Sequence, residues 1–523
     1  MSNNVQIIAR RAPSPRLERI LGPLALVFAA DLVGAFRPRL LGLMAARRES
    51  SVLDARAPEQ SAEVQVAPWR CAPVPPALED RRVELVGPVD RMSLFGALES
   101  RPDAFVADFD NATSPTWSNV LEGHLNVRDA VHGTLDVEVA GVRRPLAGPA
   151  PPILLRPRAL HLHEDHVTIE QAPAPAALFD VAMHSFHNAR TLAARGEGPF
   201  FSLTKLHGRL EARFYNDVFA YLERALTVPR GTFKVSVRID TVEAAHEMHE
   251  ILWELRERAI GLGCGRWDYV QSLIEARADD RGAVLADRRH LTVDRAPLAA
   301  CAERVVEACH ARGVQAVGPL SNEAPISPRQ EGVPAILASV RAAGHAQATR
   351  GFVGMRIAHP SLVEVARTAF DSRGEPAAMP PSREADLFRV RPGAPSEDAV
   401  RDNVRIGLLH LDAWLSGRGR IAHGTTVEDA GTARAARALL WQWVRHYVCL
   451  DDGSVLTRTR FREIVACEAE RLAVSSRVRD VFERICLAPR LSPIDASDVP
   501  APSRVAVRPD RSRRCSASPP GEL

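Results

Sequence analysis

Two carboxylates, Asp240 and Asp268, are placed where the chain could bind a metal ion. Asp240 ends the segment Phe233 to Asp240 (Phe-Lys-Val-Ser-Val-Arg-Ile-Asp), which alternates with the period of two that is typical of a strand. Asp268 lies 28 residues further on, in a second segment that we interpret as a strand. Parallel strands end at one edge of a sheet or barrel, so we expect the two acids to converge. Mg²⁺ is typically held by one or two carboxylates, and both aspartates are therefore candidate metal ligands.

The residues between the two aspartates predict a strand–helix–strand unit. Glu247 to Ile260 carries apolar residues at a mostly helical spacing, and Gly261 and Gly263 are expected to end that helix because glycine tolerates a left-handed conformation. Gly265 to Val270 is then predicted to be the second strand. The alternative for both aspartates is that each only caps a helix that follows its strand.

Arg156 and Asp429 are two further candidates for chemistry. Arg156 closes the apolar segment Pro152 to Arg156, where a guanidinium could hold a carboxylate in bidentate fashion or stabilise a developing enolate oxygen. A structural ion pair at the rim is the alternative for Arg156. Asp429 begins a predicted helix that runs to His446, where the helix dipole favours a negative charge, so by itself it could be an N-cap.

Short apolar segments separated mostly by helical stretches surround these residues. Seven of them can be recognised: Ala104–Asp108, Pro152–Arg156, Phe200–Leu203, Phe233–Ile239, Gly265–Val270, Val314–Val317 and Gly354–Ala358. Seven candidates are close to the eight strands of a (β/α)8 barrel, which places its chemistry at the carboxyl ends of the strands. We therefore expect an α/β protein built on a (β/α)8 barrel.

Composition shifts divide the rest of the chain. Helical periodicity at Val404, Leu408, Leu411 and Leu415, with Ser396 placed to cap and Gly417 to stop, predicts a helical C-terminal region. We expect the following units: residues 1–76 as an N-terminal helical region and connection, 77–370 as the barrel with an insertion around 118–150, 371–396 as a linker, 397–490 as C-terminal helices and 491–523 as a disordered tail.

Composition and charge narrow the range of partners and compartments. The 523 residues are 46% hydrophobic and 25% charged, and the net charge of +3 argues against nucleic acid as the main partner. Arg10 to Arg19 followed by the apolar run Leu21 to Ala30 imitates a signal peptide, but Asp31 ends the run and the pattern continues as an amphipathic helix. No run is long enough to span a membrane. Eight cysteines form no CxxC pair, so we expect reduced thiols in the cytoplasm.

Several longer motifs resemble one enzyme family. Gly261 to Tyr269 (Gly-Leu-Gly-Cys-Gly-Arg-Trp-Asp-Tyr) closely resembles the malate synthase signature Gly-Leu-Asn-Cys-Gly-Arg-Trp-Asp-Tyr. Five more segments are similar to A-type members of that family, in the family's order: Leu78–Pro88, Leu125–Gly133, Pro229–Thr232, Ile357–Pro360 and Val427–Ala430. The resemblance extends from about residue 20 to about residue 480.

The resemblance implies a fold and a reaction. The fold is a TIM barrel with an N-terminal helical clasp, a small α/β insertion and a C-terminal helical plug over the barrel mouth. The reaction is that of an acyltransferase of the glyoxylate cycle, which condenses acetyl-CoA with glyoxylate and water to give malate and CoA. Asp429 would be the catalytic base and Arg156 would stabilise the enolate, while Asp240 and Asp268 would hold Mg²⁺ that polarises the aldehyde.

Several residues depart from the family pattern. The family's Ile-Glu-Thr is Ile239-Asp240-Thr241 here, which shortens the proposed metal ligand by one C–C bond, about 1.5 Å. Other differences fall in predicted loops on the active face: Asp108-Phe109-Asp110-Asn111 stands for Asp-Phe-Glu-Asp, Gly318-Pro319-Leu320-Ser321-Asn322 for Gly-Gly-Met-Ala-Ala, and Val353-Gly354-Met355-Arg356 for Asp-Gly-Thr-Trp. Two alternatives therefore stay open, namely a relative that uses the same chemistry on another 2-oxo acid or acyl-CoA, and a non-catalytic homologue. The oligomeric state is not indicated.

Overall fold

A closed barrel of parallel strands forms the centre of the molecule. The structure is a computed structural model that describes residues 7–9, 14–49, 59–292, 294–325, 332–371, 384–390 and 393–491. Within these residues eight strands pair in parallel around the barrel. In chain order they are β2 (Val83–Gly87), β3 (Ala104–Asp108), β6 (Ile153–Arg156), β9 (Phe200–Leu203), β10 (Lys234–Ile239), β11 (Ala259–Cys264), β12 (Gln315–Ser321) and β13 (Gly354–Ile357). The prediction of a (β/α)8 barrel is confirmed.

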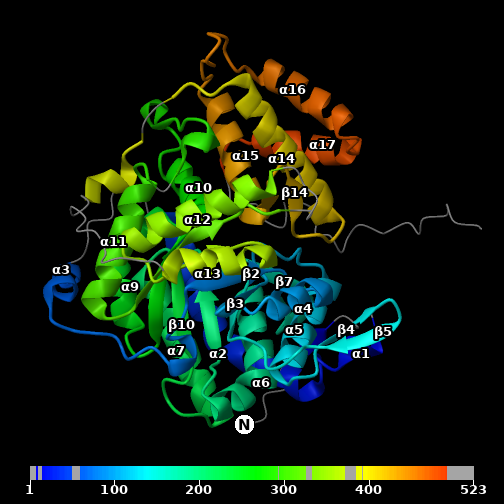
Figure 1. Ribbon diagram of the computed structural model, residues 1–523, viewed down its shortest axis with the longest axis vertical. Helices are drawn as coiled ribbons and strands as arrows, with labels where there is room; N and C mark the ends of the chain where they lie inside the picture. Colours follow the sequence, from blue (N-terminus) through cyan, green and yellow to red (C-terminus); the bar gives the residue numbers. More distant parts are fainter. Residues whose placement is uncertain are drawn as a thin grey trace, which may run out of the picture.

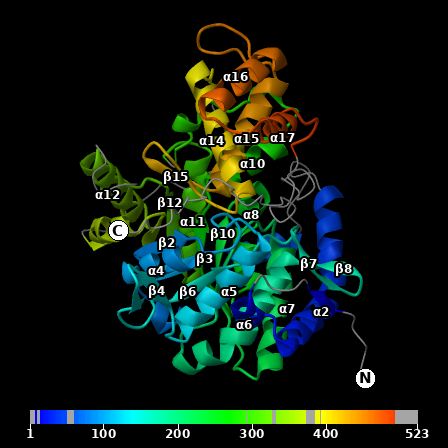
Figure 2. The same ribbon diagram turned by 90° about the vertical axis from the view of Figure 1, so that its right-hand side faces the viewer.

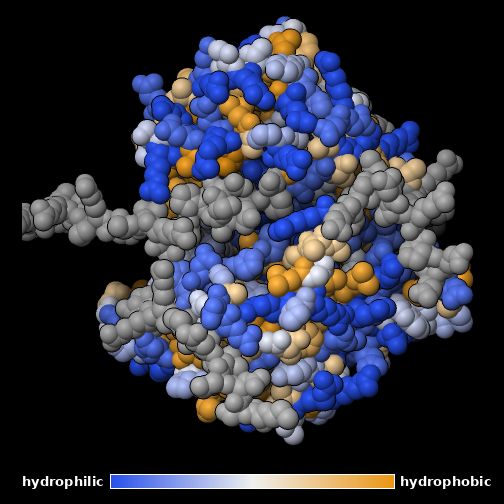
Figure 3. Space-filling model, turned by 180° about the vertical axis from the view of Figure 1, so that it is seen from behind, coloured by the Kyte–Doolittle hydropathy of each residue, from blue (hydrophilic) through white to orange (hydrophobic). Residues whose placement is uncertain are grey.

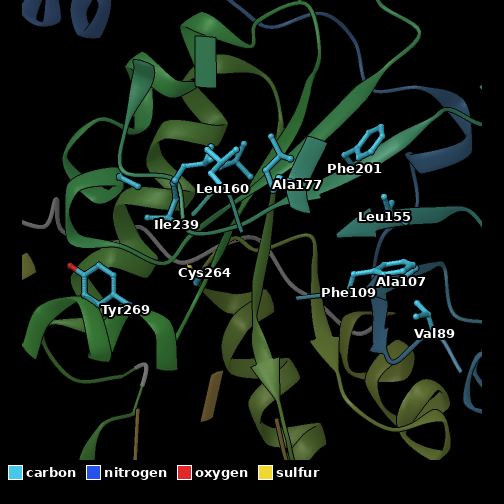
Figure 4. Close-up of a cluster of buried hydrophobic side chains, with 14 of the residues drawn as sticks. Val89, Ala107, Phe109, Leu155, Leu160, Ala177, Phe201, Ile239, Cys264 and Tyr269 are labelled. Atoms are coloured by element: carbon cyan, nitrogen blue, oxygen red, sulfur yellow. The ribbon is translucent and has the colours of Figure 1, made fainter. Parts of the chain in front are cut away.

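Helices cover the outside of the barrel and bury the main hydrophobic core against the strands (Figure 1). They are α4 (Arg91–Glu99), α5 (Trp117–Val131), α6 (Ala176–Arg195), α7 (Arg209–Leu226), α9 (Met248–Glu254), α10 (Trp267–Ala276), α11 (Leu298–Arg312), α12 (Val333–Thr349) and α13 (Val363–Asp371). Figure 4 shows Ala107, Leu155 and Phe201, from three neighbouring strands, among these buried side chains. Burying one such large apolar side chain contributes about 2 kcal/mol.

One predicted strand was wrong and two strands were missed. Gly265 to Val270 is not a strand, because the chain forms β11 from Ala259 to Cys264 and then begins helix α10 at Trp267. Gly261 and Gly263 therefore lie inside a strand instead of ending a helix. A Cβ on Gly261 would collide with the carbonyl oxygen of Gln315, so close packing of the neighbouring strand β12 explains this glycine. The missed strands are β2 and β11.

The N-terminal helix α2 (Pro23–Glu49) lies against the barrel helices. Figure 2 shows α2 beside α6 and α7, and both contacts are present in the structure. Leu32 and Val33 of α2 are fully buried, which agrees with an amphipathic helix at the position where the sequence imitates a signal peptide. The expected hairpin-like insertion is formed by β4 (Asp136–Val139) and β5 (Val142–Pro145).

Four C-terminal helices lie together at one end of the molecule, at the top of Figure 1. They are α14 (Glu397–Leu415), α15 (Ala430–Arg445), α16 (Arg458–Arg471) and α17 (Ser476–Cys486). Ser396 caps α14 by accepting a hydrogen bond from the Ala399 amide at 3.1 Å, and Gly417, which follows the helix, has a φ of 82°. From behind, the surface of these helices is mostly hydrophilic (Figure 3).

Parts of the sequence prediction stay untested. The predicted tail from residue 492 onward, together with residues 372–383 and 391–392 of the predicted linker, lies outside the described residues. The unit boundaries also stay predictions. Among the described residues, no helix is long and apolar enough to cross a membrane.

Candidate active site

Asp240 and Asp268 converge at the carboxyl end of the barrel. Asp240 directly follows β10, whereas Asp268 is the second residue of helix α10 and not a strand residue. Both carboxylates bind the same guanidinium. The Nε of Arg238 donates to Asp240 Oδ2 at 2.8 Å, and its Nη2 donates to Asp268 Oδ2. The predicted convergence is present, with the side chain of Arg238 between the two acids.

Three further residues contact this pair, one through its backbone and two through their side chains. The backbone amide of Lys205 donates to Asp240 Oδ1 at 2.8 Å. Asp268 accepts hydrogen bonds from the side-chain amide of Asn111 at 3.2 Å and from the guanidinium of Arg434 at 3.1 Å. Because Arg434 comes from α15, the C-terminal helices contribute directly to the cluster. Asp240, Asp268, Arg238 and Asn111 each have less than one tenth of their surface exposed, whereas Lys205 and Arg434 are partly exposed.

The charges around the pair shift its pKa values in opposite directions. Burial alone would raise the pKa of Asp268, but Lys205, Arg238 and Arg434 outweigh burial and hold that pKa well below its usual range. The pKa of Asp240 is raised, because burial outweighs the attraction of Arg238 and the nearby Asp268 adds to the effect. Burial would lower the pKa of Arg238, yet Asp240 and Asp268 raise it above its ordinary value, so Arg238 is charged.

Arg156 ends β6 and has unused hydrogen-bond donors. Its Nη1 donates to Asp108 Oδ2 at 2.8 Å, so the structural ion pair that the sequence left open does exist. However, Nε and Nη2 of Arg156 are buried and have no hydrogen-bond partner among the described residues. Buried donors without partners are uncommon in proteins and indicate a position where a ligand oxygen could bind.

Asp429 is the N-cap of α15. Its Oδ1 accepts a hydrogen bond from the Thr432 amide at 3.1 Å, and the Thr432 hydroxyl accepts one from the Asp429 amide at 2.8 Å, which completes a capping box. Its Oδ2 accepts no hydrogen bond from the described residues. A Cβ placed on Gly431 would lie 3.3 Å from Asp429 Oδ1 and 3.3 Å from Asp268 Oδ2, so the two carboxylates face the same glycine.

A hairpin and its polar contacts hold Asp429 over the barrel mouth. The hairpin pairs β14 (Ile421–His423) with β15 (Thr426–Glu428) directly before the helix. Glu428 accepts hydrogen bonds from Arg288 at 3.1 Å and from Asn322 at 3.3 Å, both on loops at the barrel mouth. The Ala430 amide also donates to the carbonyl oxygen of Asn111 at 3.1 Å. These bonds fix the start of α15 relative to the strand ends.

A small cavity and a larger cleft meet at this point. The cavity is lined by Asp268 and Asp429 and by four arginines, Arg156, Arg238, Arg266 and Arg356. The cleft has a volume of about 610 Å³ and runs between the loop after β2, the loop after β13 and the segment Gly417 to Ala422. Val86 lines both, so the cleft and the cavity lie next to each other. A ligand in the cleft would therefore lie beside the cavity that contains Asp429.

The proposed metal ligands do not fit a resident Mg²⁺ in this arrangement. Mg²⁺ requires near-octahedral oxygen ligands at about 2.0 to 2.1 Å. The guanidinium of Arg238 already bonds to both Asp240 and Asp268, and Asp268 also binds Arg434. Both carboxylates are therefore already bonded to cationic side chains of the protein itself.

Sequence reasoning missed several members of the cluster. Arg238 is two residues before Asp240 on a strand, so the period of two places both side chains on one face and could have identified it. Arg356 stood among the departures without a role; its Nη1 and Nη2 are buried without hydrogen-bond partners in the described part of the chain, and burial lowers its pKa to about 10. Arg434 carried no signal, because only the docking of α15 brings it to Asp268. Asn111, on the loop after β3, stood among the departures without a role.

Two family models match the chain. The model described as malate synthase, TIM barrel domain matches residues 152–388, and the model described as malate synthase, C-terminal matches residues 394–495. The malate synthase of Myxococcus xanthus is 39% identical over 507 residues, which cover 92% of this chain and 94% of that protein. Malate synthase A of Escherichia coli is 35% identical over 471 residues, which cover 87% of this chain and 88% of that protein.

Solved structures with a similar fold include malate synthase of Haloferax volcanii. Its pyruvate/acetyl-CoA ternary complex has a TM-score of 0.45 and 17% identity, covering 77% of this chain and 98% of that chain. Its magnesium/glyoxylate complex has a TM-score of 0.42 and 15% identity, covering 78% of this chain and 99% of that chain. These likenesses are too distant to carry an argument about the site.

Proposed function

The chain belongs to the malate synthase family, and we propose how its own residues perform the family's reaction. It is an acyltransferase that condenses acetyl-CoA with glyoxylate and water to give malate and CoA. In our proposal the small cavity at the barrel mouth is the active site. One observation carries this proposal. The helix-capping Asp429, the buried Arg156 with its unused donors, and Arg238 with its partner Asp268 all line the same cavity.

Asp429 is proposed as the base that takes a proton from the acetyl methyl group. Its Oδ1 is held by the helix that it caps, while Oδ2 accepts no hydrogen bond from the described residues. An N-cap carboxylate is rigidly oriented, which favours proton transfer at a fixed position. Asp429 would thus be both the cap that the residue type suggests and the base that the resemblance implies.

Arg156 is proposed to stabilise the enolate that this proton transfer generates. The developing negative charge would lie on the thioester oxygen of acetyl-CoA. The free Nε and Nη2 of Arg156 supply buried donors for that oxygen, while the ion pair with Asp108 holds the guanidinium in place. Such preorganised donors stabilise charge that develops in the transition state.

The larger cleft is proposed to hold the CoA part of acetyl-CoA. Arg418, Arg420 and His359 line it and could favour an anionic ligand. The guanidinium of Arg420 is fixed by hydrogen bonds to the carbonyl oxygens of Val86 at 2.7 Å and Ala358 at 3.2 Å. Because Val86 also lines the small cavity, a thiol arm in the cleft would deliver its acetyl end toward Asp429.

Magnesium and the cytoplasmic location are the finer parts of the sequence prediction. Magnesium at Asp240 and Asp268 stays a prediction. The bonds of Arg238 to both carboxylates argue against it. A cytoplasmic location stays our inference. It is supported by the cysteines of the described residues, which are all free thiols.

A CoA-release assay over a panel of 2-oxo acids tests the proposed function. We expect glyoxylate to give the highest rate and malate to accumulate in equal amount. Larger 2-oxo acids belong in the panel because Nη1 and Nη2 of Arg356, which lines the cavity, are buried donors without partners among the described residues. If another 2-oxo acid reacts about tenfold faster than glyoxylate, the substrate assignment is wrong.

A further inference from the structure

We propose that the guanidinium of Arg238 takes the place of a divalent cation in this active site and polarises the aldehyde of the 2-oxo acid. This inference rests on the proposed function. Its starting observation is that one side chain bonds to both carboxylates that would otherwise be the metal ligands, at 2.8 Å to Asp240 and by a charged hydrogen bond to Asp268. Arg238 also lines the cavity that contains Asp429.

The local backbone builds this position for an arginine. Arg238 and Asp240 lie two residues apart at the end of β10, so their side chains share one face of the strand. On the neighbouring chain segment, Gly265 leaves room for them. A Cβ on Gly265 would collide with the Cβ of Asp240 and lie 3.3 Å from the Nε of Arg238. Arg238 is only 7% exposed, so it is a packed part of the site.

Electrostatics disfavour adding a metal ion to this cluster. Asp268 already interacts with Arg238 and Arg434, and the ammonium group of Lys205 binds Asp110 and Asn111 beside it. Like charges a few ångströms apart repel each other strongly inside a protein, and a divalent ion doubles the repulsion that a single charge would meet. Displacing Arg238 would leave a buried guanidinium without its carboxylates, which is strongly unfavourable.

An arginine can supply the charge that the reaction needs. Nε and Nη2 of Arg238 hold the carboxylates, and Nη1 makes no hydrogen bond to the described residues. As the enolate carbon bonds to the aldehyde carbon, the carbonyl electron pair moves onto the aldehyde oxygen, which accepts a hydrogen bond from Arg238. The alkoxide is then neutralised, by way of solvent water, by the proton that Asp429 took from the methyl group, so Asp429 is again a carboxylate. The one water that the reaction consumes hydrolyses the thioester and releases CoA. Charge-assisted donors of this kind stabilise a developing oxyanion.

Metal binding without substrate tests the inference directly. The probe is Mn²⁺ alone, titrated into metal-depleted wild-type protein and followed by electron paramagnetic resonance, with Mg²⁺ as competitor. We expect no binding to the wild type at Mn²⁺ concentrations up to about 1 mM. Arg238→Met leaves the two carboxylates without their shared cation, so we expect this variant to bind Mn²⁺. Added Mg²⁺ should displace the bound Mn²⁺. Arg238→Lys keeps a positive charge and should bind no metal.

A matched control removes another arginine from the same cavity. Arg356→Met lowers the charge equally but leaves Arg238 between Asp240 and Asp268, so it should bind no Mn²⁺. Binding to the wild type at about 0.1 mM or below overturns the inference, even if Arg238→Met does not fold. Equal binding by Arg356→Met and Arg238→Met would also overturn it.

CoA release by the same preparations separates this inference from the proposed function. We expect Arg238→Met to lose about 100-fold in kcat in metal-depleted buffer, with partial recovery by Arg238→Lys. If no variant and no wild-type protein releases CoA from any 2-oxo acid, the proposed function fails, while the Mn²⁺ result still decides whether Arg238 occupies the cation position.

Discussion

Two buried clusters of arginine and carboxylate lie inside the same barrel, one toward each end of its strands. Toward the amino ends, Glu84 of β2 accepts hydrogen bonds from Arg81 at 2.9 Å and from Arg356 at 2.8 Å. At the carboxyl ends, Arg238 bridges Asp240 and Asp268. Glu84, Asp240 and Asp268 are all buried, so the ion pairs themselves are of similar kind at the two ends.

The clusters differ in what surrounds them. The remaining donors of Arg81 go to Gln315 at 3.0 Å and Ser236 at 3.2 Å, so that arginine bonds to groups on the barrel strands. The carboxyl-end cluster instead includes residues of loops and of α15. Arg238 and Asp268 line the cavity that contains Asp429, and of the amino-end cluster only Arg356 reaches that cavity among the described residues. The comparison indicates that similar arginine–carboxylate ion pairs stabilise the barrel at one end and form part of the proposed active site at the other. The difference lies in the residues that the carboxyl-end loops and the C-terminal helix α15 add there.

The largest expected effect follows from removing the base above the carboxyl-end cluster. Asp429→Asn keeps a residue type that caps helices well, but a neutral amide cannot take the methyl proton. We expect kcat for CoA release to fall by about 1,000-fold or more with an unchanged melting temperature. Asp280→Asn, at another aspartate N-cap, is the matched control and should retain full activity. Turnover of Asp429→Asn within about tenfold of the wild type would remove Asp429 from the mechanism.

A smaller loss of activity is expected from Arg156→Lys. Lysine keeps the charge and can still pair with Asp108, but it lacks the fixed fork that leaves two donors free. We expect kcat to fall by about 100-fold, while KM for acetyl-CoA changes little, because the donors act on the enolate and not on the bound substrate. A raised KM with kcat unchanged would show that Arg156 only helps to bind substrate.

Breaking the amino-end cluster should change stability more than chemistry. Glu84→Gln leaves Arg81 and Arg356 without their shared negative charge, and we expect the free energy of unfolding in urea to fall by about 3 kcal/mol. Glu257→Gln, in the exposed pair with Arg230, is the control and should cost less than about 1 kcal/mol. A loss of activity at Glu84→Gln as large as that at Asp429→Asn would abolish the distinction between the two ends.

The smallest expected effect is a pH dependence of stability. Arg81 and Arg356 outweigh burial and lower the pKa of Glu84 to about 2, so its contribution is lost only as the pH falls from the ordinary value of 4.5 through about 2. Glu275 of α10 is the opposite case, because burial raises its pKa from 4.5 to about 7. Its contribution is present below pH 4.5 and is lost as the pH rises through 7.

We therefore expect stability to decline between about pH 5 and pH 8, and Glu275→Gln to remove about 1 kcal/mol of that decline. The measurement is the urea unfolding midpoint of both proteins across this range. Parallel curves for the wild type and Glu275→Gln would show that Glu275 titrates normally.

Much of the barrel follows from local patterns, and the errors have physical causes. The alternation in Phe233–Asp240 identified β10, because a strand buried on two faces still shows its period when polar residues enter the barrel interior. The prediction for the segment around Asp268 was wrong, because Gly261 is required by the close approach of strand β12 and Gly263 by the guanidinium of Arg356, and neither ends a helix. Tertiary packing of this kind leaves no local signal.

The site was predictable only in part for the same reason. Asp240, Asp268 and Arg156 were found because each stands at or near a strand end, and Asp429 because it starts a helix. The role of Arg238 depends on the distance between two acids that are 28 residues apart, and that of Arg434 depends on docking of α15 on the barrel. Neither contact can be predicted from one segment of sequence, because each depends on how distant segments pack together.

Malate formation by chelator-treated wild-type protein is the most direct test of the claim that the carboxyl-end cluster works with its own cation. Acetyl-CoA and glyoxylate are supplied in metal-depleted buffer, and malate is measured with and without added Mg²⁺. We predict initial rates that agree within about twofold. A rate that falls about tenfold or more on chelation and returns with Mg²⁺ would contradict the account, because the ion would then have to displace Arg238 from Asp240 and Asp268.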